Sequence, residues 1–198
     1  MVSTKSFIAA FAALAVAPLA AAGNCTFDSS KPFTLHTEVV KGPEDFNNFF
    51  LTAFHVGASR QTVVGTRNAS RSIGWVISNT SDLQQPIGNL PPFNLTLLDQ
   101  APTMSSAPDG YDYIDLSYRG STPGFSFLPS NKSTAVLEYN TPSNKTSDFV
   151  TFALCHVNGT APYFTVGPQY QLLWRSVVAA ETDYESCADV ELVAHNIE

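Results

Sequence analysis

The sequence has little charge and few of the features that mark membrane or metal proteins. Only 14% of its residues are charged, against 44% that are hydrophobic, so it lacks the surplus of charge that keeps a disordered chain solvated. After residue 22 no apolar run is long enough to span a bilayer, and the end of the chain, Glu191 to Glu198, is polar where a lipid-anchor signal needs a hydrophobic tail. We expect a folded, soluble domain with no membrane anchor.

Motifs of metal and nucleophile chemistry are missing as well. The sequence has neither H-E-x-x-H nor paired cysteines with zinc spacing, and G-x-S-x-G is absent, since the stretch Gly120 to Gly124 reads as a loop. The four histidines are scattered along the chain at positions 36, 55, 156 and 195. The sequence therefore predicts no metal and no cofactor, and it identifies no catalytic residue.

The charge that is present is mostly acidic. Asp and Glu number 17 and Lys and Arg number 10, for a net charge of −7. This sign repels phosphate backbones and anionic lipids, so binding to nucleic acid by counterion release is not expected.

The N-terminus has the pattern of a secretory signal. Lys5 supplies the positive charge, residues 7–16 supply an apolar run, and Ala20-Ala21-Ala22 fits the small-residue cleavage site. We expect cleavage after Ala22, a secreted, extracellular product, and one domain over residues 23–198, which is the length of a single core.

Glycosylation sequons are dense after this signal. An N-x-S/T sequence without a middle proline occurs seven times, which fits a eukaryotic secretory route and marks exposed positions. We expect glycans on at least four of them. The seven asparagines are Asn24, Asn68, Asn79, Asn94, Asn131, Asn144 and Asn158.

Alternation of apolar and polar residues predicts strands. In FTLHTEVV, Phe33, Leu35 and Val39 share one face, and the runs 93–97 and 188–194 alternate in the same way. Continuing along the chain gives twelve candidate strands, near 33–40, 48–56, 61–66, 72–78, 92–98, 111–118, 124–128, 133–139, 148–156, 162–166, 169–175 and 187–195.

Turn signals separate these strands. Asn158-Gly159 fits a type I′ turn and Pro108-Asp109-Gly110 marks another, while Gln84–Pro92 and Asp99–Ala107 read as loops. Short, closely spaced strands without a convincing amphipathic helix predict an all-β fold, a compact antiparallel barrel or trefoil-like domain, with a β-sandwich as the alternative.

Three cysteines follow the signal, so in an oxidising compartment two are expected to pair. Cys155 lies in an apolar run and Cys187 opens the last strand, and a bond between them would join two predicted core strands. Cys25 lies beside the cleavage site, where it is either a capped residue or the source of an intermolecular disulfide.

Four segments carry a resemblance to a known family. They are FTLHT (33–37), FNNFFLTAFHVGA (46–58), Cys155 with PYFTVGPQYQLLW (162–174), and SCADVELV (186–193). In these the chain resembles an uncharacterised family of small secreted fungal all-β glycoproteins with a C-terminal cysteine pair. The resemblance implies a secreted all-β domain and pairing of Cys155 with Cys187; it implies no activity.

The densest acidic cluster is the best candidate ligand surface. Asp109, Asp112 and Asp115 match no calcium-loop spacing, and alternation puts the last two on opposite faces of a strand. Tyr111 and Tyr113 share a face with Asp115, and tyrosines beside a carboxylate can stack on sugar rings and bond their hydroxyls.

Two functions follow. The first, which we favour because no catalytic constellation is recognisable, is a non-catalytic module that binds cell-wall glycan or a host surface protein, or coats the wall. The alternative is a glycan-acting hydrolase with an Asp/Glu pair about 5 to 10 Å apart. The sequence fixes neither the ligand nor the oligomeric state.

Overall fold

The computed structural model describes residues 26–57, 60–98, 111–128, 132–140, 149–157, 169–176 and 185–197. Several predictions fall on other residues and lie outside this set: the signal segment 1–22, the strand 162–166, both turn signals, the loop 99–107, Asp109, Cys25, and the sequons at Asn24, Asn131, Asn144 and Asn158.

The all-β prediction is confirmed. The described residues form twelve strands: β1 (Phe33–Lys41), β2 (Phe50–Gly57), β3 (Arg60–Thr66), β4 (Val76–Ile77), β5 (Leu83–Ile87), β6 (Leu90–Leu97), β7 (Tyr111–Ser117), β8 (Phe125–Phe127), β9 (Thr134–Tyr139), β10 (Phe149–Val157), β11 (Gln169–Ser176) and β12 (Cys187–Asn196). The described helical turns are both 3-10, η1 (Glu44–Phe46) and η2 (Ala69–Arg71). Most strand positions agree with the alternation pattern to within two residues.

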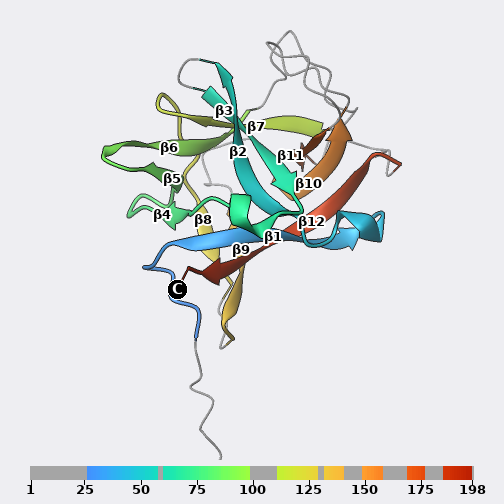
Figure 1. The fold of residues 1–198 in the computed structure, drawn as a ribbon, viewed down its shortest axis with the longest axis horizontal. Coiled ribbons are helices and arrows are strands. Elements are labelled where there is room, and N and C mark those ends of the chain that lie inside the picture. The colour runs from blue at the N-terminus through green and yellow to red at the C-terminus, as the bar shows by residue number, and fades with distance from the viewer. Residues whose placement is uncertain are drawn as a thin grey trace, which may run out of the picture.

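All twelve strands belong to one antiparallel sheet that closes into a ring (Figure 1). The closed path runs β1–β2–β3–β11–β10–β12 and returns to β1. Strands β7, β6, β5 and β4 branch from it at β11 and β3, and β9 and β8 branch from β12. The ring strands come from the two ends of the chain, whereas a trefoil takes its barrel strands evenly from three successive thirds of the chain. A sandwich would have two sheets, and these strands form one. The predicted compact antiparallel all-β fold is therefore confirmed as a single ring-like sheet, without the strand order of a trefoil or the two sheets of a sandwich.

The interior of this ring holds the main core. On β1, Phe33 and Leu35 point inward, as the alternation predicts, and Trp75 and Trp174 are fully enclosed with them. The predicted inward set of β6 is likewise buried in this core, and so is that of β12: Phe93, Leu95, Leu97, Ala188, Val190, Leu192 and Ala194.

The segment predicted as a loop at Gln84–Pro92 is instead most of a β-hairpin. Strands β5 and β6 pair through Gln85 with Phe93 and Ile87 with Leu90, around a two-residue turn in which Gly88 has a φ of +51°. The prolines suggested a loop, but Pro86 lies at a register irregularity, where a strand tolerates a residue without an N–H. The Gly-Asn pair at the turn was the signal for the hairpin.

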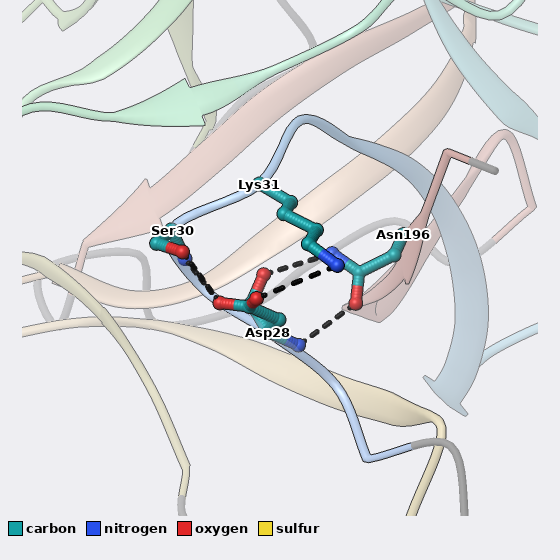
Figure 2. Close-up of polar contacts among 4 residues, drawn as sticks. All are labelled: Asp28, Ser30, Lys31 and Asn196. Atoms are coloured by element: carbon teal, nitrogen blue, oxygen red, sulfur yellow. Dashed lines mark hydrogen bonds and ion pairs between the residues drawn. The ribbon is translucent and has the colours of Figure 1, made fainter.

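The segment before β1 is clamped to the end of β12 (Figure 2). The Asp28 N–H donates to Asn196 Oδ1 at 2.8 Å, and Asn196 Nδ2 donates to the Asp28 carbonyl oxygen at 2.8 Å. The Ser30 hydroxyl donates to Asp28 Oδ1 at 2.6 Å, and this bond is the main reason why the pKa of Asp28 is lowered. Lys31 Nζ lies 3.8 Å from the other carboxylate oxygen. These contacts join the first and last described segments outside the strand pairing.

Candidate functional site

The disulfide predicted between Cys155 and Cys187 is present. The two residues face each other across the β10–β12 pairing, and their sulfur atoms are 2.03 Å apart. Both side chains are fully buried. The bond joins two ring strands that are 32 residues apart in sequence.

A small second cluster surrounds this bond on the outer side of the sheet. Phe152 and Leu154 of β10 point into the main core, so Ala153 and Cys155 point to the opposite face. The cluster, which we call the disulfide face, consists of Tyr111, Ala153, Cys155, Leu173 and Cys187, with Tyr113 and Val157 packed against it.

The three residues of the candidate ligand surface do lie on one face, but with different exposure. Tyr111 is 4% exposed and Asp115 is 9% exposed, whereas Tyr113 is half-buried. Both tyrosines belong to the disulfide face. Tyr113 is directly opposite Leu173 of β11, which is another member of that face. Their ligand role stays a prediction, and of the three Tyr113 has the most accessible side chain.

Asp115 lies in a row of polar side chains rather than in an open acidic cluster. It is directly opposite Thr62 of β3 and Thr96 of β6. Gln171 of β11 donates through Nε2 to Thr62 Oγ1 at 2.8 Å, and Thr62 and Gln171 are themselves buried. Asp112 pairs with the inward-pointing Trp174, so the two acids occupy opposite faces, as the alternation predicts.

An ion pair that sequence reasoning missed borders the disulfide face. Arg175 Nη2 lies 2.7 Å from Asp189 Oδ2, and Arg175 Nε donates to Asp189 Oδ1 at 3.3 Å. Asp189 is directly opposite Ala153, and Arg175 is opposite Tyr111. The partners come from different strands, so no local sequence pattern indicated their contact.

Two of the four scattered histidines meet on the outer face where β1 pairs with β12. The ring centroids of His36 and His195 are 4.8 Å apart, and His36 Nε2 lies 3.6 Å from Glu38 Oε1. Burial lowers the pKa of His36, the charge of His195 lowers it further, and Glu38 acts in the opposite direction. The alternation of apolar and polar residues puts His36 on the polar face of the first strand and His195 on that of the last, and the missing information was that these two strands pair.

Two carboxylates also face each other in this pairing. Glu38 is directly opposite Glu191, and both residues are exposed. Directly opposite residues in an antiparallel pair have Cβ atoms about 4.5–5.5 Å apart.

The three described sequons occupy different settings. Asn68 is exposed and caps η2, its Oδ1 accepting from the Ser70 N–H at 3.0 Å. Asn79 is exposed in a turn closed by the bond from the Ser81 N–H to the Ser78 carbonyl oxygen. Asn94 is half-buried in β6, and its Oδ1 accepts from Gln84 Nε2 at 2.9 Å.

Within the described ranges, no group of three or more His, Cys, Asp or Glu side chains is arranged to hold a metal ion. The same residues include no helix long and apolar enough to cross a membrane.

Comparison with protein families matches residues 30–196 to a domain of unknown function (DUF7907). Comparison with curated proteins and with solved structures gives no match. The matched range begins before β1 and ends with β12, so it contains every described strand and the disulfide.

Proposed function

Because the chain belongs to the family described as a domain of unknown function, DUF7907, we propose its role from the chemistry of the molecule: it is a secreted, N-glycosylated binding module that attaches to a cell-wall glycan or a host surface protein without turnover. The observation that carries this proposal is the buried disulfide between two ring strands. Structural disulfides form and persist in oxidising compartments, above all outside the cell.

The positions of two sequons support the secreted and glycosylated form. Asn68 and Asn79 are both exposed and lie in turns, outside the strands of the sheet. A glycan on either Nδ2 atom leaves the Oδ1 bond of Asn68 and the backbone bond of the Asn79 turn intact. Glycans at these turns fit the fold without disturbing the ring.

The scaffold supports binding more directly than turnover. A sheet closed into a ring and joined across β10 and β12 by the disulfide holds outward side chains in fixed positions. Tyr113 is half-buried beside that bond, and a tyrosine supplies a flat apolar ring with a polar tip. We therefore place the ligand contact at Tyr113.

Secretion and glycosylation are tested by intact mass. Protein secreted by a eukaryotic host is weighed before and after enzymatic removal of N-glycans, and we expect a chain that starts after Ala22 and loses mass on deglycosylation. A chain that keeps Met1, or one with no glycan, would contradict this part of the proposal.

Binding is tested on a panel of wall polysaccharides with matched variants. Tyr113→Ala should weaken any measured binding about 5- to 150-fold, the range of roughly 1–3 kcal/mol for interface aromatics. Tyr118→Ala is the control, because Tyr118 is another accessible tyrosine, 38% exposed and stacked on Phe93 away from the disulfide face. Equal weakening by both variants would contradict a contact at Tyr113.

One observation favours the alternative of a glycan-acting hydrolase. Glu38 and Glu191 are directly opposite each other in the β1–β12 pairing, and glycoside hydrolysis uses two neighbouring carboxylates. Reproducible hydrolysis of a wall polysaccharide, lost in Glu38→Gln or Glu191→Gln but retained in Glu44→Gln, would replace the binding proposal with this one. Glu44 suits the control because it is another exposed acid, on η1 rather than in the β1–β12 pairing.

A further inference from the structure

The strongest unassigned feature is the seam where the ring closes. Strands β1 and β12 pair along almost their whole length, so the first and last strands of the chain hold the ring shut (Figure 1). His36 is in the middle of this seam, opposite Val193, and His195 is two residues further along β12, opposite Thr34.

The surroundings of His36 disfavour a positive charge on its ring when His195 is also protonated. The residue is 8% exposed. The centroid of its ring is 4.8 Å from that of His195, on β12, and 6.1 Å from that of Phe50, on β2. The charged groups that face it are His195 and, on its own strand, Glu38 at 3.6 Å. On the far side of His195, β9 presents Thr134, which does not titrate.

The charge balance of this group depends on how many protons it holds. With one imidazolium, Glu38 compensates the charge. With two, the second positive charge lies beside the first in a poorly solvated place, where an unscreened like charge is costly. Glu191 lies directly opposite Glu38. Because Glu191 is exposed, solvent screens its attraction for the positive charge of the histidines.

We propose that the His36–His195 pair makes closure of the ring sensitive to acid, so that double protonation in a mildly acidic medium loosens β1 from β12. The seam is closed at neutral pH and opens first among the described strand pairs on acidification. A secreted protein meets such media outside the cell, and loosening the seam would free the edges of two strands.

The direction follows from linkage. The pKa of His36 is lowered in the folded protein from its ordinary 6.5. The unfolded chain therefore binds more protons than the folded one below about pH 6.5, and stability that is complete above this pH is lost as the pH falls toward the folded pKa.

The test compares the pH dependence of unfolding in four proteins: wild type, His36→Gln, His195→Gln and His156→Gln. Urea unfolding is measured at pH 8 and at pH 5. The unfolding equilibrium constant of the wild type should rise by a larger factor on acidification than that of His195→Gln, because the variant keeps the burial that lowers the pKa of His36 but loses the contribution of the His195 charge. His156 is the matched control, since it is an exposed histidine beside the Tyr170 ring on another strand pair.

Hydrogen exchange locates the change. Peptides from β1 and β12 should lose protection at pH 5 relative to pH 7.5 after correction for intrinsic rates, whereas peptides from β6 and β7 should keep it. The proposal would be overturned if the stability of wild type and His195→Gln depended equally on pH. It would also be overturned if His156→Gln reduced the pH dependence as much as His195→Gln does.

If the seam variants do not fold, the wild type itself decides. An NMR titration of the imidazole protons should show His36 titrating below its ordinary pKa and its resonance responding to the protonation of His195. Independent titration of both rings at ordinary values would overturn the proposal.

Discussion

Removal of the Cys155–Cys187 bond tests how much of this fold depends on its covalent link. We expect Cys155→Ala combined with Cys187→Ala to lower the free energy of unfolding while the ring still forms, because the same strands pair through Phe152 with Val190 and Leu154 with Ala188. The bond restricts mainly the unfolded chain. For a separation of 32 residues, the loop-closure relation gives about 3 to 4 kcal/mol at 25 °C.

The structure adds a second contribution. Both cysteines are fully buried in the disulfide face, so deletion of their sulfur atoms also leaves unfilled space beside Leu173. The loop-closure figure is therefore a lower bound on the loss of unfolding free energy in the double variant. The slope of the unfolding free energy against urea concentration should rise, because the unlinked chain exposes more surface when it unfolds.

The assay is equilibrium urea unfolding of the purified protein, followed by tryptophan fluorescence, with Cys25→Ala as the control. Because the Cys155–Cys187 bond already satisfies both partners, the control should unfold as the wild type does. A loss below about 1 kcal/mol in the double variant would refute the loop-closure reasoning, and non-reducing peptide mapping that links Cys25 to either partner would refute the pairing.

Two further predictions concern stability and are checked by thermal or urea unfolding. Gly124→Ala should cost about 3 kcal/mol or more, because its φ is +121° and an added Cβ would lie 2.4 Å from the backbone oxygen of Asn140; Gly88→Ala, with a φ of +51° but open space around it, should cost only about 1 kcal/mol. Equal losses would mean that the clash is relieved. Asp189→Asn should cost about 3 kcal/mol at neutral pH, because it removes the charge that partners the Arg175 guanidinium, whose side chain is only 17% exposed; a loss that persists unchanged in an Arg175→Met background would show that the pair is not its source.

Prediction from the sequence worked where one face of a strand had to be apolar. Phe33 and Leu35 were placed in the core by alternation alone, and the hairpin missed at Gln84–Pro92 still carried a readable Gly-Asn turn. The pattern is local and repeats every two residues, so any strand with one side in the core shows it.

The burial of residues on the outward face of a strand could not be predicted from this alternation. Tyr111, Tyr113 and Asp115 were correctly assigned to one face, but nothing in the run itself indicated that Tyr111 and Asp115 would be almost fully buried there. Exposure of an outward residue depends on which strands and segments lie beside it, and β7 lies between β6 and both β3 and β11.

The residue pattern alone predicts the all-β class, the inward sets of the strands and the cysteines suited to pair. Which strands are neighbours emerges from the folded chain, and with it the closure of one sheet into a ring, the contact of His36 with His195 and the ion pair of Arg175 with Asp189. The physical reason is range: side-chain alternation is set by the backbone of each strand, whereas strand order is set by the burial of the whole core and by the loop-closure entropy of joining the two ends of the chain.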